Sequence, residues 1–254
     1  MANQNHMSAW EHYLVGTSIF TLGIAGTFIN SIILYRNYCK ETTRKPNPLV
    51  ANLCLTNLGI IFFAFPLSGL ASFKLDWIWG DEWCTYYGAV SLFFGFNIMI
   101  TMMMLVLDIF LQYNYGNYDS YKDRARRLMI IWGWINSIFW SAAPLLGWSR
   151  ISYEPTRTSL LMVIARLKPN KDYTPISIDY VKSYRKILIL LFLFAIEWSP
   201  YALVYLWPLF SDPNKIPLEL SAAAPVFAKF SVVFSPLLFW KEAKPEENIE
   251  PTNT

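Results

Sequence analysis

The sequence predicts an all-α fold, a polytopic bundle of membrane-spanning helices. Two observations support this prediction. Hydrophobic residues make up 54% of the 254-residue chain and charged residues only 15%, whereas soluble domains contain about 25% charged residues. Six separate, mainly apolar segments are also long enough to cross a bilayer, which takes about 20 residues of helix. The net charge of +3 is too small to indicate a nucleic-acid partner.

The six predicted spans alternate in direction, as their flanking charges indicate. In chain order they cover residues 14–35, 48–73, 86–111, 128–148, 187–210 and 217–240. Basic residues gather in three connections: Arg36, Lys40, Arg44 and Lys45 after the first span; Lys122, Arg124, Arg126 and Arg127 before the fourth; and Arg166, Lys168, Lys171, Lys182, Arg185 and Lys186 before the fifth. Because loops rich in lysine and arginine remain cytoplasmic, we expect residues 1–13 to be extracellular and residues 241–254 to form a cytoplasmic tail.

This alternation leaves residues 149–186 unexplained. The fourth span ends outside, yet the next predicted span must begin in the cytoplasm, so the chain between them must cross the membrane once. The only apolar run there covers residues 160–165 and is far shorter than a crossing helix. Either a helix is missing from the chain or the last two spans are inverted, and we favour a missing helix.

Lys229 is the residue whose position most strongly indicates a function. It lies near the middle of the last span, roughly 16 Å from either end at about 1.5 Å per residue, which is too far for its side chain to reach water. A lysine at that depth costs roughly 2.5–3.5 kcal/mol and by default marks a functional site. One such function is chemical, since a neutral amine condenses with an aldehyde to form a Schiff base. The alternative is a lysine that is paired with a buried acid and has no further role.

Several motifs belong to one pattern. They are Phe-Ala-Lys-Phe-Ser at 227–231, Trp-Ser-Pro-Tyr-Ala at 198–202, Leu-Gly-Trp-Ser at 146–149 and Tyr-Glu-Pro at 153–155, together with Asn30, Trp134 and the pair Trp83-Cys84. In these motifs the chain resembles the opsins, which are retinal-binding members of the rhodopsin-like receptor family. It is most similar to the retinochrome, RGR-type and peropsin branch, whose members act mainly as retinal photoisomerases. The resemblance implies a bundle of rhodopsin type that lacks the fifth family helix.

The resemblance also implies a cofactor and a site. Retinal would be bound covalently through a Schiff base to Lys229. The residues implied to line its pocket are Trp198, Tyr201, Tyr87 and Phe227. Tyr87 stands where vertebrate visual pigments carry a glutamate counter-ion, so the counter-ion candidate here is Glu154 in the second extracellular loop. The alternative for Glu154 is an ordinary solvated loop acid.

Glu197 is an acid inside an apolar span, where an ionised carboxylate is costly. It is therefore either protonated or paired with a polar group across the bundle. Because it directly precedes Trp198, it is also a secondary candidate for tuning the Schiff base. The test is Glu197→Gln: an unchanged absorption maximum would remove it from the site.

Three positions depart from the family along the route that normally carries a signal to a G protein. The acid-Arg-Tyr triplet appears as Asp-Ile-Phe at 108–110, the Asn-Pro-x-x-Tyr motif as Ser-Pro-Leu-Leu-Phe at 235–239, and the second-helix aspartate as Asn57. These losses disfavour a G protein as a partner and leave the retinal pocket largely intact. The family's loop cysteine is also missing, so Cys84 is predicted to be free, and the three cysteines lack the spacing of a metal site.

Three functional hypotheses follow. The preferred one is a light-driven retinal isomerase that converts all-trans-retinal to the 11-cis form. The alternatives are a light-activated sensory opsin that couples to a G protein, and a truncated, inactive isoform, which a missing helix would explain. Each places the protein in a membrane, either the plasma membrane or an intracellular membrane of a photoreceptor cell.

Overall fold

A computed structural model describes residues 8–38, 46–115, 118–143, 146, 178–212 and 216–240 of the chain. Every regular element in these residues is a helix. In chain order they are α1 (Ala9–Tyr38), α2 (Pro48–Phe63), α3 (Phe65–Phe73), α4 (Gly80–Asn114), α5 (Tyr118–Ala142), α6 (Ile178–Leu206), the short 3₁₀ helix η2 (Trp207–Leu209) and α7 (Leu218–Leu237). The predicted all-α fold is confirmed.

Side-chain caps fix the ends of α1 and the start of α2. The backbone N–H and the hydroxyl of Ser8 both donate to the Glu11 carboxylate, at 2.7 and 2.8 Å, as in a capping box. At the other end of α1, Asn37 and Asn47 bond reciprocally, with donor–acceptor distances of 3.2 and 3.1 Å. The Asn47 side chain also accepts a bond from the N–H of Leu49. These bonds hold the end of α1 against the start of α2.

The helices α2 and α3 form one membrane-length unit that is interrupted at Ala64. Together they cover Pro48–Phe73, the same bounds that the sequence predicts for the second span. Pro66 has no backbone N–H, and its ring would clash with a carbonyl one turn earlier, so a helix cannot pass through it undisturbed. Ala64 accordingly has φ −115°, far from the helical average of about −63°. Phe65 is the first residue after this interruption.

Three other helices begin well before the predicted spans. The structure starts α4 at Gly80, α5 at Tyr118 and α6 at Ile178, whereas the apolar runs begin at residues 86, 128 and 187. Apolarity marks only the part of a helix that faces hydrocarbon, while backbone hydrogen bonding continues into the charged turns at its end. The basic residues before the fourth and fifth predicted spans therefore include helical ones, such as Arg126 and Lys186.

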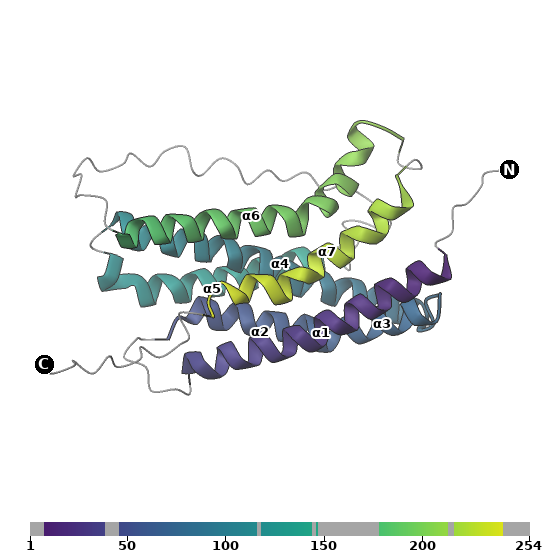
Figure 1. The fold of residues 1–254 in the computed structure, drawn as a ribbon, viewed down its shortest axis with the longest axis horizontal. Helices are drawn as coiled ribbons and strands as arrows, with labels where there is room; N and C mark the ends of the chain where they lie inside the picture. The colour runs from purple at the N-terminus through teal and green to yellow at the C-terminus, as the bar shows by residue number, and fades with distance from the viewer. Residues whose placement is uncertain are drawn as a thin grey trace, which may run out of the picture.

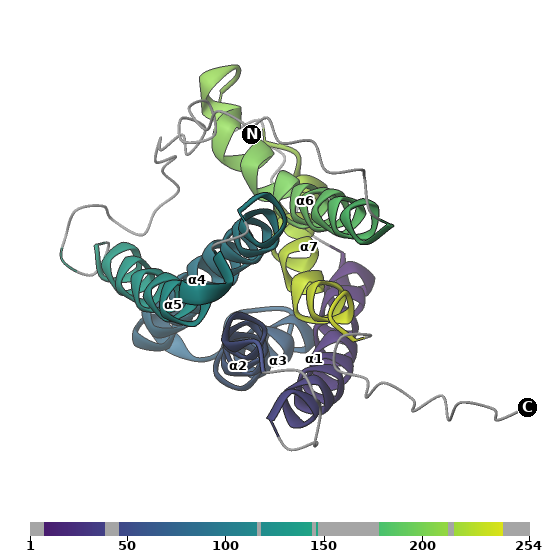
Figure 2. The ribbon, with the colours of Figure 1, turned by 90° about the vertical axis from the view of Figure 1, so that its left-hand side faces the viewer.

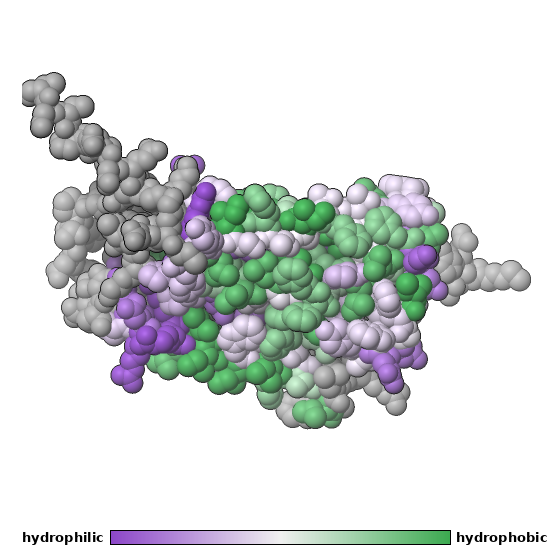
Figure 3. Space-filling model, turned by 90° about the horizontal axis from the view of Figure 1, so that it is seen from below, coloured by the Kyte–Doolittle hydropathy of each residue, from purple (hydrophilic) through white to green (hydrophobic). Residues whose placement is uncertain are grey.

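Four helices in the described part of the chain are long and apolar enough to cross a membrane. They are Ala9–Tyr38, Pro48–Phe73, Gly80–Gln112 and Tyr184–Val204, and α7 contains the shorter apolar stretch Ala223–Leu237. Figure 3 shows hydrophobic residues over the middle of the visible face and hydrophilic residues toward its two ends. This distribution is the one that a membrane-embedded bundle requires.

The helices lie side by side in one bundle (Figures 1 and 2). The central helix is α4, which contacts α2, α5 and α6, while α7 contacts α1, α2 and α6. The main apolar cluster includes Leu53, Leu105 and Phe239, and a second cluster joins α1, α2, α3 and α7 around Phe65 and Val232. These contacts bring α7, the helix that carries Lys229, into the interior of the bundle.

A buried hydrogen-bond network fixes α2, α4 and α5 to one another. Asn52 donates to Asn97 at 3.0 Å and to Thr101 at 2.8 Å. It also accepts a bond from the indole N–H of Trp134 at 2.8 Å, and Thr56 donates to Asn97 at 3.0 Å. Buried polar groups need such partners where water is absent. Trp134 therefore holds α5 against the centre of the bundle.

The helices α5 and α6 run in the same direction. In Figure 1, α4 runs from right to left, α5 returns from left to right, and α6 begins again at the left. Leu146, just after α5, and Ile178, at the start of α6, therefore lie at opposite ends of the bundle. The prediction that a family helix is missing concerns the chain between them, which lies outside the described residues.

Candidate functional site

Lys229 is buried in the bundle, as its predicted role requires. Its side chain is on α7 and only 8% of the residue is exposed. The Nζ atom lies 3.5 Å from the carbonyl oxygen of Pro225 and 5.6 Å from the centroid of the Phe65 ring. The amine is therefore held between its own helix and the start of α3.

Tyr87 interacts with Lys229 from a different helix. Its side chain on α4 interacts with Lys229, with Ser68 on α3 and with Ser91 on α4. The Tyr87 hydroxyl thus gives the amine a polar, uncharged neighbour, and Ser68 and Ser91 surround that hydroxyl. Tyr87 therefore lies near Lys229, while its place in the retinal pocket stays a prediction. Ser68 and Ser91 are neighbours that the sequence did not single out.

No acidic side chain in the described ranges forms an ion pair with Lys229. This excludes Glu197 and the acids of α4 as direct partners of the amine. The predicted counter-ion, Glu154, lies outside the described residues, so its role stays a prediction. The alternative of a lysine fixed by a buried acid finds no such acid among the described residues.

Trp198 and Tyr201 lie together on α6, where it faces α4 and α7. Their ring centroids are 6.3 Å apart and their planes are inclined by 29°. A Cβ atom on Gly95 of α4 would lie 3.7 Å from the Trp198 ring, so glycine at this position allows α4 and α6 to approach closely. Trp198 packs against the main apolar cluster. Two of the four predicted pocket residues thus pack against each other, and their place in a retinal pocket stays a prediction.

Phe227 points elsewhere. It is 37% exposed and its ring packs edge-on against Phe230, at 5.7 Å between centroids. Residues two positions apart in a helix differ in direction by about 200° around its axis. Phe227 and Lys229 therefore project from different sides of α7. The role of Phe227 in the retinal pocket stays a prediction, and the contacts of its ring do not support it.

Glu197 is paired across the bundle, which is one of the two alternatives that the sequence leaves open. The residue is 2% exposed. The Ser235 hydroxyl, on α7, lies 3.3 and 3.2 Å from its two carboxyl oxygens and 3.4 Å from the sulfur of Met102 on α4. Ser235 follows Lys229 by six residues, about 9 Å along the helix. Glu197 therefore joins α6 to α7 nearer the C-terminal end of α7 than Lys229, and it does not contact the amine.

We expect Ser235→Ala to lower the free energy of unfolding in detergent micelles by about 1–3 kcal/mol, because it removes the hydrogen bond of a buried carboxyl group. Ser231→Ala is the matched control. Ser231 is equally buried on α7, but its hydroxyl bonds to the Ala228 carbonyl of its own helix at 2.6 Å. Chemical denaturation of both variants measures the difference, and equal losses would mean that the Glu197–Ser235 contact contributes nothing.

The structure also contains a buried ion pair that the sequence analysis missed. Arg126 on α5 donates two hydrogen bonds to Asp108 on α4, each of 2.8 Å, and Gln112 donates a third at 2.7 Å. Asp108 is the acid of the altered acid-Arg-Tyr triplet, whose arginine is replaced by Ile109. The sequence did offer one signal. Asp108 has Ile109 where the family carries an arginine, so a cation that pairs with Asp108 has to come from another part of the chain. Cys84 is free and exposed, as predicted.

Comparisons with known proteins agree with this architecture. No protein-family model matches the chain. The human visual pigment-like receptor peropsin is 25% identical over 283 residues, covering 91% of this chain and 81% of peropsin. Mouse opsin-5 is 26% identical over 280 residues, covering 91% of this chain and 74% of that protein. The crystal structure of squid rhodopsin has the same fold, with a TM-score of 0.71 and 22% identity over 94% of this chain and 85% of that one.

Both sequence alignments are longer than the 254 residues of the chain itself. The relatives therefore carry residues at positions where this chain has none. Similarity nevertheless extends over nine-tenths of the chain, and the fold and the buried lysine of the last helix agree with it. The chain therefore resembles the opsins over most of its length, and its helical membrane bundle has the rhodopsin fold.

Proposed function

We propose that this opsin is a retinal-binding photopigment in which the chromophore is joined to Lys229, and that it acts mainly as a photoisomerase from all-trans- to 11-cis-retinal. The observation that supports this most is the burial of the Lys229 amine, 8% exposed, in the last helix of an opsin bundle. An amine kept away from water is suited to bond formation with an aldehyde.

The residues around Lys229 fit an apolar aldehyde. The Nζ atom would attack the aldehyde carbon, and formation of the C=N bond would release water. Phe65 supplies aromatic surface and Tyr87 a hydroxyl near the nitrogen. We propose that Trp198 and Tyr201, which pack together on α6, supply the rest of the aromatic surface. Retinal, when bound, supplies the light absorption and the double bond that isomerises. The shape of the protein walls would then select which isomer fits.

A positive charge on the bound nitrogen needs an anion nearby, because a charge in a dry site is otherwise costly. Glu154 stays the proposed counter-ion. Since the described residues offer Lys229 hydroxyl groups and no carboxylate, replacement of Glu154 by Gln should move the visible absorption band or shift it to the near ultraviolet. An unchanged spectrum would assign Glu154 to the loop surface.

Isomerisation is favoured over signalling by the cytoplasmic half of the bundle. The acid that normally neighbours an arginine on its own helix is bonded instead to Arg126 of α5. Phe239, which replaces the family tyrosine, is 1% exposed, and the Lys186 ammonium of α6 lies 4.0 Å from its ring centroid. These contacts hold α4 against α5 and α6 against α7. They do so without the arginine and the tyrosine that the family motifs use to pass the signal to a G protein.

Illumination with two parallel measurements tests the proposal. Purified protein in lipid nanodiscs is incubated with all-trans-retinal in the dark and illuminated, and the retinal is extracted and separated by chromatography. We expect 11-cis-retinal to accumulate with little stimulation of nucleotide exchange on an added G protein. Robust exchange without net isomerisation would support the second candidate, a signalling opsin, which is favoured by the naming of human peropsin as a receptor. Absence of both a visible band and a retinal adduct that borohydride can trap would support the inactive isoform.

The protein is an integral membrane protein. We propose that it resides in the plasma membrane or in an intracellular membrane of a photoreceptor cell. Both locations supply the lipid-dissolved retinal that a site in the middle of a bundle requires.

A further inference from the structure

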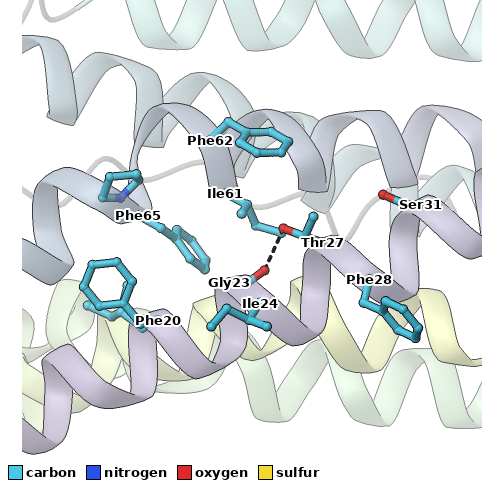
Figure 4. Close-up of a pocket in the computed structure, with 11 residues that line it drawn as sticks. Phe20, Gly23, Ile24, Thr27, Phe28, Ser31, Ile61, Phe62 and Phe65 are labelled. Carbon is cyan, nitrogen blue, oxygen red and sulfur yellow. Dashed lines mark hydrogen bonds between the residues drawn. The ribbon is translucent and has the colours of Figure 1, made fainter.

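An apolar groove runs along the outside of the bundle between α1 and the α2–α3 unit (Figure 4). Its volume is about 540 Å³, within the range of about 300–1,000 Å³ that holds small molecules. Ile24, Phe28 and Phe62 on its rim are 73%, 68% and 62% exposed. The groove is therefore open toward the side of the bundle that faces lipid.

The lining of the groove suits a hydrocarbon chain. It contains no charged residue. The Thr27 hydroxyl, which lies between α1 and α2, donates to the Gly23 carbonyl of its own helix at 2.8 Å (dashed in Figure 4). It is thus already satisfied and does not demand a polar ligand. Aromatic rings of Phe20, Phe62 and Phe65 offer flat apolar surface to an extended molecule.

Phe65 connects this groove with Lys229. The residue is 2% exposed and lines the inner side of the groove. The Lys229 Nζ atom lies 5.6 Å from the centroid of the same ring. One aromatic side chain thus contributes to the groove wall and to the surroundings of the amine.

Phe65 also occupies a weak point in the backbone. It is the first residue of α3, between Ala64, where the helix is interrupted, and Pro66, which cannot donate a backbone hydrogen bond. Helices bend at such interruptions more readily than within an intact hydrogen-bonded stretch. A displacement of this ring therefore disturbs fewer backbone bonds than it would in a continuous helix.

We propose that this groove is the port through which retinal passes from the bilayer to Lys229, with Phe65 as the gate. The inference rests on the proposed function. The occupant is an extended polyene aldehyde, which is apolar along its length and polar only at the carbonyl that must reach the amine. The groove offers an apolar surface along the length of the polyene. The short distance between Phe65 and Lys229 brings the carbonyl end near the amine.

The rate at which the visible band appears tests the port. Protein in nanodiscs is mixed with all-trans-retinal in the dark, and absorbance is followed with time. Thr27→Trp places an indole between α1 and α2 and should slow the appearance of the band at least about tenfold, which corresponds to roughly 1.4 kcal/mol of barrier. Phe65→Leu removes ring area from the gate and should accelerate it. The final absorbance of Thr27→Trp should match that of the unmodified protein, because Thr27 lies outside the surroundings of the amine and Lys229 is retained.

Ile138→Trp on α5 is the matched control, since it adds the same side chain at a position that is 56% exposed and outside the groove. Its rate should be unchanged. If Thr27→Trp and Phe65→Leu both form the band at the unmodified rate, retinal enters elsewhere, the groove holds only lipid chains, and the port is excluded. If the unmodified protein forms no band, the proposed function itself fails, so the two failures are distinguishable.

Discussion

Lys229→Ala should abolish the visible absorption band completely. The physical reason is covalent: without the amine no C=N bond can form, and a neutral aldehyde held only by apolar contacts absorbs in the near ultraviolet. Within the described residues, Lys229 is the lysine that lies buried in the bundle core, 8% exposed. Absorbance after dark incubation with retinal measures the effect.

Lys74→Ala is the control for this loss. Lys74 is exposed at the end of α3, so its removal should leave the band intact. Borohydride reduction of the pigment followed by peptide mass mapping should place the adduct on the peptide that contains residue 229. A full band in Lys229→Ala, or an adduct on another peptide, would contradict the proposed attachment.

Arg126→Met should destabilise the protein by about 3–5 kcal/mol, the usual cost of removing one partner from a buried ion pair. Asp108 is 0% exposed and Arg126 is 6% exposed, so water cannot replace the guanidinium. The two parallel bonds of 2.8 Å are the bidentate geometry in which arginine binds a carboxylate most strongly. The free energy of unfolding in detergent micelles reports the loss.

Two further variants separate the pair from a general effect of charge. Arg124→Met, at an exposed position of the same helix, should change stability by less than about 0.5 kcal/mol. The double variant Asp108→Leu with Arg126→Met should regain most of the stability, since an apolar pair of similar volume replaces a buried ion pair with little cost. A single variant as stable as the control would show that the pair is not a structural lock.

Much of the fold could be predicted because each span is a local signal. A run of apolar residues, a basic flank or a proline acts within one helix, and Lys229 was conspicuous because its charge conflicts with its own surroundings. The bounds of the α2–α3 unit followed from such signals. The early starts of α4, α5 and α6 did not, since helical hydrogen bonding continues where apolarity stops.

Contacts between helices were the part that sequence patterns could not supply. Asp108 and Arg126 are 18 residues apart and Glu197 and Ser235 are 38 apart, and only the packing of α4 on α5 and of α6 on α7 brings them together. Phe227 illustrates the same limit, because its proximity to Lys229 in sequence implies nothing about a shared direction on the helix. Family motifs located Trp198 and Tyr201, whereas Ser68, Ser91 and the groove at Phe65 emerge only from the bundle.

The parallel orientation of α5 and α6 has a consequence for how this chain is inserted. In the bundle, α1 begins at one end and α7 finishes at the other (Figure 1), which demands an odd number of traverses. In the described part of the chain the helical units are α1, α2 with α3, α4, α5, α6 and α7, an even number. An epitope tag placed after residue 240 therefore reports on which side of the membrane α7 ends. If the tag is accessible from the cytoplasm, α7 and Lys229 have the orientation expected of an opsin. If the tag is accessible only from outside, α6 and α7 are inserted in the inverted orientation.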